Sequence, residues 1–167
     1  MADSTGKPSF LKKAMLKNRS IGQTLKGYEF KLTIAEFPDL SAHFRTSQWP
    51  ATKREIVDDN GFMGVSMPSY GALDNSPEIT ITAVENIEGK VMEMLRDVIV
   101  NGKEVTITME AMPESADGIP PSALIREMEY CLLTSDAIDA STEDTTTTVK
   151  PSITVRCGWL NEDDVKA

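Results

Sequence analysis

The sequence has little of several residue types on which common functions depend. Its 167 residues include two cysteines, one histidine and only 6% aromatic side chains. Cys131, Cys157 and His43 lack the spacing of a zinc site, so we expect no metal and no cofactor. Free cysteines are commonly buried, which predicts two small core residues; a disulfide formed after release from the cell stays open as an alternative.

Long hydrophobic runs are also absent. No apolar run approaches the roughly 18 residues that a membrane-spanning helix needs. Residues 1–20 lack the apolar core and the cleavage site of a secretory signal. We therefore expect a soluble protein that is made in the cytosol and has no membrane partner. The length suits one domain with its own core.

Motifs that carry chemistry are missing as well. The sequence contains no dinucleotide-binding glycine motif, P-loop, G-x-S-x-G, H-E-x-x-H or EF-hand pattern. No motif places a nucleophile or carboxylate beside His43, which predicts an ordinary surface imidazole. The acidic groups at Asp58–Asp59 and 162–164 lack calcium-loop spacing. Paired acids of a glycosidase depend on tertiary distance and stay open, but we expect no enzyme and no catalytic residue.

Charge is distributed unevenly. Residues 1–26 hold six of the 17 Lys and Arg residues but only one of the 26 Asp and Glu residues. The remainder is strongly acidic, which excludes nucleic-acid binding by phosphate neutralisation. Residues 7–19 place Phe10, Leu11, Met15 and Leu16 among lysines in a short amphipathic pattern, which is either docked or mobile. We divide the chain into a basic arm (1–24), a folded domain (25–160) and an acidic tail (161–167).

The domain shows mainly the period-two alternation of half-buried strands. Tyr28–Ile34 alternates clearly, and a second strand from Ala42 ends at Trp49 before Pro50. Two short strands flank an Asn-Gly turn at Asp58–Gly61, which predicts a hairpin, followed by a loop at Ser69–Asn75. The further predicted strands are Glu78–Val84, Glu104–Glu110, Leu124–Ser135 and Ser152–Trp159, the last with Ile153, Val155, Cys157 and Trp159 on one face.

One helix is expected, over residues 86–102. Asn86 is the candidate cap, and Asn101-Gly102 is typical of a helix end. Val91, Met94, Leu95 and Val98 form an apolar stripe for a sheet to cover. The predicted fold class is mainly β: an antiparallel sandwich or barrel with one flanking α-helix and an extended β-hairpin.

Three long phrases in this order resemble a known family. They are GYEFKLTIAEFPDLSAHFRTSQWPATKREIVD, then NGFMGVSMPSYGALDNSPEITITAVENIEGKVMEMLRDVIVNG, then VKPSITVRCGWL. Together they resemble the tail tube proteins of bacteriophages with contractile tails, which are related to pyocin and type VI secretion tube proteins. The likeness covers about residues 25–160 and rests on the order and spacing of the phrases.

The resemblance implies a structural virion protein. Hexameric rings would stack into the inner tube of a contractile tail, assembled in the cytoplasm of the host bacterium. Tail sheath, baseplate and tail terminator proteins would be its partners, and the tape measure protein and then phage DNA would pass through the lumen without specific binding. The basic arm would contact a neighbouring ring or the acidic body of a neighbour, with the sheath as the rival partner.

The resemblance also implies roles for residues. The hairpin would reach neighbouring subunits. Its segment GFMGVSMPSYGAL carries no charge, which suits a repeated contact because a charge there would be buried in every copy. Polar strand positions would face the lumen or, alternatively, the outer wall. The expected interface residues are Trp49, Phe62, Met63, Val65, Met67 and Tyr70, and the expected lumen residues are Glu55, Glu78, Thr80 and Thr82.

A different class of function remains as the alternative. A monomeric β-sandwich could serve as a carbohydrate- or peptide-binding module. Carbohydrate sites usually cluster exposed aromatic side chains, whereas Trp49 and Trp159 are isolated in the sequence. The oligomeric state of the purified protein separates the two hypotheses.

Overall fold

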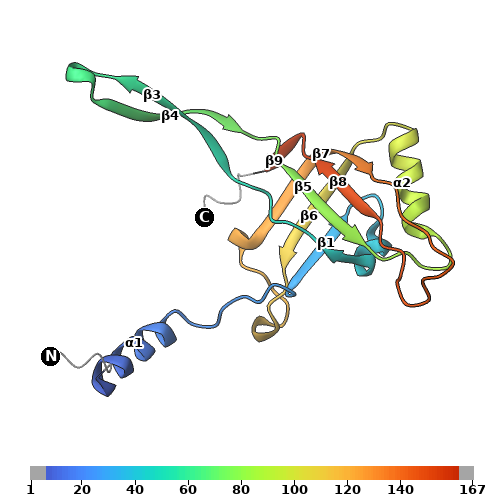
Figure 1. The fold of residues 1–167 in the computed structure, drawn as a ribbon, viewed down its shortest axis with the longest axis horizontal. Helices are drawn as coiled ribbons and strands as arrows, with labels where there is room; N and C mark the ends of the chain where they lie inside the picture. Colours follow the sequence, from blue (N-terminus) through green and yellow to red (C-terminus); the bar gives the residue numbers. More distant parts are fainter. Residues whose placement is uncertain (1–6, 162–167) are drawn as a thin grey trace.

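A computed structural model describes residues 7–161. It shows a nearly closed antiparallel barrel whose strands follow the order β1-β6-β7-β8-β5-β2, with β9 paired to β7 (Figure 1). This confirms the predicted fold class. The strands are β1 (Phe30–Ile34), β2 (Phe44–Thr46), β5 (Glu78–Ala83), β6 (Val105–Ala111), β7 (Ile125–Ser135), β8 (Ser152–Arg156) and β9 (Trp159–Asn161).

The long strand β7 joins the two halves of the barrel. Its first half pairs with β6 on one side and β9 on the other, while Leu132–Ser135 pair with β8. The predicted alternation is confirmed in β6, where Val105, Ile107 and Met109 are buried. Inward side chains of β5 and β8 complete the core, which consists of aliphatic residues, methionines and the two cysteines.

The helix α2 (Lys90–Val100) covers one side of the barrel, and its predicted stripe is buried. It begins four residues later than predicted, after a turn that ends at Gly89 in the left-handed conformation. Asn86 Oδ1 accepts a hydrogen bond from Lys90 N–H (3.3 Å). The main cap, however, is the Glu85 carboxylate, which accepts from Val91 N–H (3.1 Å) and Met92 N–H (2.6 Å).

The predicted second strand is present but shorter than expected. Residues Pro38–His43 form the 3-10 helix η1, and only Phe44–Thr46 pair with β5 as β2. Pro38 stands in the first turn, where its fixed φ suits a helix, and Leu40 turns into the core. His43 is half-buried in η1 rather than on a strand, and its Nδ1 lies 2.9 Å from the Val84 carbonyl oxygen.

The predicted last strand is interrupted. β8 ends at Arg156, and β9 resumes at Trp159, whose side chain is exposed rather than in line with Ile153 and Val155. Gly158 lies between them and donates its N–H to the Glu129 carbonyl oxygen (3.2 Å). The chain therefore crosses from β8 to β9 against the backbone of β7.

The arm forms the helix α1 (Pro8–Ser20), which lies apart from the barrel on the side opposite α2 (Figure 1). A hairpin of β3 (Lys53–Asn60) and β4 (Ser66–Asp74) also projects from the barrel. The predicted acidic tail falls outside the described residues, apart from Asn161. No described helix is long and apolar enough to span a membrane.

Candidate subunit interface

The β3–β4 hairpin is longer than the sequence indicated. The predicted turn at Asp58–Gly61 and the predicted loop at Ser69–Asn75 are both wrong: Asp58, Asp59 and Asn60 pair with Pro68, Met67 and Ser66. The chain reverses just after these residues, in a single 3-10 turn over Phe62–Gly64. A hydrogen bond from Gly61 N–H to the Val65 carbonyl oxygen (2.9 Å) closes this turn. The paired strands continue almost to β5.

The conformation of the tip explains this shift. The positive φ angles lie at Met63 (63°) and Gly64 (70°), not at Asn60 and Gly61. A methionine in the left-handed region is uncommon and strained. This backbone points the Met63 side chain outward, where it is 83% exposed, beside Phe62, which is 90% exposed.

The hairpin has almost no contact with its own barrel. All eight residues of β3 are exposed, and β4 is exposed except at Gly71, which is half-buried. A two-stranded ribbon is at best marginally stable in water without a surface to pack on. The predicted residues Phe62, Met63, Val65, Met67 and Tyr70 are all exposed on it, so the structure brings these five together.

Trp49 stands apart from them, partly exposed in the segment that leads from β2 to the hairpin. Three further exposed apolar residues, Ile56, Val57 and Leu73, were missed in the sequence. Their signal was present, because Ile56 and Val57 are consecutive β-branched residues in a polar strand. With them, apolar side chains are exposed on both faces of the hairpin from the tip toward the root, and exposed apolar patches can mark interaction sites.

The root of the hairpin is held firmly. Asn75 and Pro77, between β4 and β5, accept hydrogen bonds from Leu160 N–H (3.2 Å) and Cys157 N–H (3.0 Å). The hairpin therefore enters the barrel through residues fixed to the β8–β9 crossing.

The expected lumen residues fall into two places. Glu78, Thr80 and Thr82 lie along β5, in the four-stranded run β2-β5-β8-β7, with their side chains turned away from the core. Glu55 lies on the hairpin instead. Glu78 is the register partner of Arg156, and Thr80 is the partner of Thr154.

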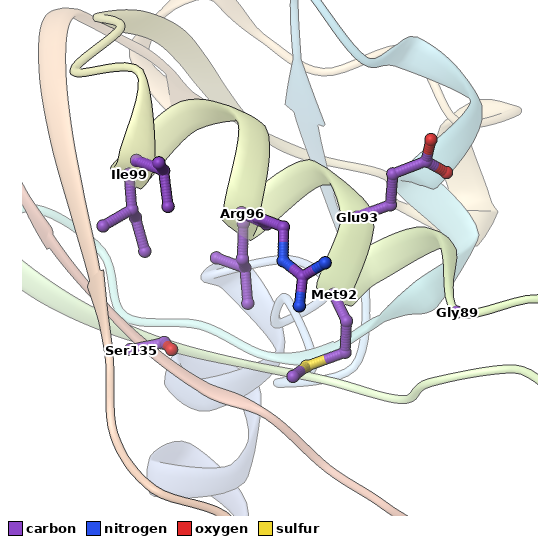
Figure 2. A pocket seen from close by; sticks show the side chains of 8 residues that line it. Gly89, Met92, Glu93, Arg96, Ile99 and Ser135 are labelled. Carbon is purple, nitrogen blue, oxygen red and sulfur yellow. The ribbon is translucent and has the colours of Figure 1, made fainter.

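The outer side of α2 carries a separate hollow of about 480 Å³ (Figure 2). Met92, Ile99 and Val100 give it an apolar character, and Glu93 and Arg96 supply one charge of each sign. Its floor reaches Ser135 at the end of β7. The charges in this hollow balance, so it has no electrostatic preference for an acidic or a basic partner.

The two cysteines are free and buried in the described structure. The Cys131 thiol donates to the Met128 carbonyl oxygen (3.3 Å). The neighbouring Cys157 thiol and burial raise the pKa of Cys131, so its thiol stays protonated and unreactive at neutral pH. Within residues 7–161, no group of three or more His, Cys, Asp or Glu side chains could hold a metal ion.

No protein-family model matches the chain, and no curated protein matches its sequence. Solved structures do match its fold. A chain of the sheath–tube complex of an extracellular contractile injection system, PVC, is 14% identical with a TM-score of 0.58, covering 87% of this chain and 95% of that chain. A chain of the anti-feeding prophage baseplate is 7% identical with a TM-score of 0.64, covering 84% and 95%.

A chain of the virion of a gene transfer agent is 14% identical with a TM-score of 0.54, covering 83% of this chain and 98% of that chain. The chain therefore shares its fold with chains of contractile and tail-like assemblies. This tail-tube-like fold confirms, at the level of fold, the resemblance noted in the sequence.

Proposed function

We propose that the chain is the subunit of a tube in a tail-like particle. Copies associate side by side into rings through the β3–β4 hairpin, and the rings stack. The observation that carries this proposal is the hairpin itself, which projects from the barrel and exposes apolar side chains that no other part of the described residues covers. The likeness of fold to chains of tube-containing assemblies supports it.

The barrel offers a wall for such a tube. The run β2-β5-β8-β7 would supply four strands per subunit, and six subunits would form a continuous inner barrel. A barrel of roughly 24 strands, about 4.8 Å apart and tilted by roughly 36°, has a backbone diameter of roughly 45 Å. Such a bore passes a DNA duplex with side chains allowed for.

The finer proposal is that the particle is a contractile phage tail and that the tube conducts DNA into the host. Sheath, baseplate, terminator and tape measure proteins would then be the partners. The outward face of β5 and β8 suits passage without binding, because hydroxyl side chains accompany one Glu78 and one opposing Arg156. Phosphate binding requires an excess of basic side chains, which these two strands do not provide.

Negative-stain electron microscopy of the purified full chain tests the proposal. Sixfold rings or long tubes are the expected result. A stable monomer at high concentration would reject the proposal and favour the carbohydrate- or peptide-binding alternative. Particles purified from producing cells then test the finer proposal, since DNA ejection distinguishes a phage tail from a protein-delivering system.

A further inference from the structure

The helix α1 is an amphipathic helix that packs against nothing else in residues 7–161. None of its 13 residues is buried by the described part of the chain. Phe10, Leu11 and Met15 fall on one side of the helix, and they are 68%, 56% and 48% exposed. Lys13 and Lys17 border this side, at helical spacing. A helix of this length is marginal alone in water. A surface that stabilises α1 would be acidic, to match its lysines, and apolar where it meets the apolar side of the helix.

Such a surface lies between η1 and α2. A hollow of about 370 Å³ has Phe37 and Pro38 among its apolar residues, and four carboxylates line it with a single lysine, Lys90. Lys90 forms an ion pair with Glu88 (3.0 Å), and the charges of Glu88, Asp39 and Glu93 raise its pKa, so this one lysine offsets only part of the acidic charge of the hollow. The carboxylates are those of Glu36, Asp39, Glu93 and Asp97.

Two of these carboxylates are engaged within the chain. Asp97 pairs with Lys103 (2.8 Å), and Glu36 accepts a hydrogen bond from Thr106 N–H (3.2 Å). Asp39 and Glu93 are exposed at the hollow. The hollow therefore keeps a negative excess, whereas the hollow in Figure 2, which shares Glu93 with it, also contains Arg96.

We propose that α1 of one copy binds this acidic hollow on a second copy of the chain. Its lysines would meet Asp39 and Glu93, and its apolar side would cover Phe37 and Pro38. The arm leaves the barrel at the Phe30 end of β1, whereas the hollow follows the Ile34 end, and α1 and α2 lie on opposite sides of the barrel (Figure 1). The nine residues 21–29, which connect α1 to β1, span at most about 30 Å when fully extended.

This contact is head-to-tail, because the two surfaces differ. Heterologous contacts propagate into rings or filaments rather than closing into a dimer. The inference rests on the proposed self-assembly and assigns it a second link besides the hairpin. An arm that joins copies in this way would secure each subunit to a neighbour even where the hairpin contact opens.

Disulfide trapping in the full-length chain tests the contact. One protein carries Met15→Cys, a second carries Pro38→Cys, and the two are mixed under mild oxidation. Cys131 and Cys157 are buried and do not compete. We expect a cross-linked dimer of the two proteins, in several-fold greater yield than with a control partner carrying Ser141→Cys in the exposed loop 136–149. Equal yields would overturn the proposal.

A single chain carrying both cysteines identifies the occupant. Linkage within that chain, without linked dimers in the mixture, assigns the hollow to its own arm and also overturns the proposal. Asp39→Lys with Glu93→Lys should lower the dimer yield several-fold, and Lys13→Glu with Lys17→Glu in the arm protein should restore it. Asp139→Lys with Glu143→Lys, the same charge change on the exposed loop, should leave the yield unchanged.

The outcome is separable from that of the proposed function. If the wild-type chain forms rings or tubes but the trapped dimer is absent, the arm contact alone is rejected. A wild-type chain that stays monomeric in micrographs rejects the tube itself.

Discussion

Glu78 in β5 and Arg156 in β8 are register partners across an antiparallel pair, on the side of the sheet that faces away from the core. Side chains at such positions lie close enough to interact. On β5 the negative charge of Glu78 is thus opposed by a positive charge on β8, and the acidic excess of the chain lies elsewhere.

Reversal of this charge should make the wall attract DNA. In tubes of Glu78→Lys protein, six lysines would join six arginines, and we expect tubes that still assemble but slow DNA ejection and retain DNA fragments at low salt. The matched control is the swap Glu78→Lys with Arg156→Glu, which keeps the net charge and should restore passage. Unchanged ejection by the single variant would remove Glu78 from the lumen.

Met63→Asp should abolish assembly and leave a folded monomer. The new carboxylate would be buried without a partner in every ring contact, which is costly. The tip itself should tolerate the change, because aspartate adopts the left-handed conformation of Met63 more readily than most residues. Sedimentation velocity and circular dichroism measure the two properties. Ile119→Asp, at an exposed position in the connection between β6 and β7, is the control that should still assemble; assembly by both variants would exclude the tip from the interface.

Gly158→Ala should destabilise the barrel by about 1–3 kcal/mol, the range for overpacked sites. A Cβ at this position would lie 2.7 Å from the Tyr130 carbonyl oxygen and 2.8 Å from Tyr130 Cβ. Tyr130 already has a φ of 54°, so β7 cannot move away freely. Chemical denaturation gives the free energy of unfolding. Gly27→Ala, which meets no atom within 4 Å, should cost little; equal losses would mean that the contact with Tyr130 is unimportant.

Glu85→Ala should destabilise α2 by about 0.5–2 kcal/mol, the usual cost of losing an N-terminal cap. Its carboxylate satisfies two backbone N–H groups at the start of the helix, and these would lose their partner. Glu88→Ala removes only an exposed ion pair with Lys90 and should have little effect. Thermal unfolding compares the two, and a larger loss for Glu88→Ala would contradict the assignment of the cap.

Acidification should weaken the hydrogen bonds that hold the segment joining the arm to β1. Glu29 is 8% exposed, and its carboxylate accepts hydrogen bonds from Lys26 N–H (2.7 Å) and Glu114 N–H (3.1 Å). These bonds lower the pKa of Glu29 below its ordinary value of 4.5. A lowered pKa in the folded state means that the stabilisation is complete above the ordinary value and is lost as the pH falls through the folded one.

Hydrogen exchange at the Lys26 and Glu114 amides measures this loss. Protection should fall on acidification below the ordinary pKa, once the intrinsic pH dependence of exchange is removed. Glu29→Gln should lower the protection at neutral pH and make it independent of pH in that range. A wild-type protection that does not change with acid would show that the carboxylate does not hold the arm.

The sequence predicted those elements that bury one face. β5, β6 and α2 alternate or repeat with the period of their geometry, because one side of each packs on the core. The sequence phrases that resemble tail tube proteins include β5 and α2, and they predicted the tail-tube-like fold. The buried stripe of α2 was correct in every residue, although the helix began later than predicted.

The hairpin was underestimated for the opposite reason. Both faces of β3 are exposed in the described structure, so its sequence has no alternation of apolar and polar residues. Asp58, Asp59 and Asn60 therefore resembled a turn, although they are paired with β4. Cap residues such as Glu85 are also hard to predict, since its carboxylate reaches the first residues of α2 across an intervening turn. Which residues would line a lumen depends on how copies associate, which a single sequence describes only indirectly.

The attachment of the hairpin has a mechanical consequence. Only Asn75–Pro77 separate β4 from β5, and this joint is bonded to the β8–β9 crossing. A pull on the hairpin therefore loads β5 lengthwise against β8, where the ladder bonds must fail together rather than one after another. In the proposed tube, the barrel would transmit tension from a neighbouring subunit into its own sheet, so the tube would stretch as one body when a force acts along it.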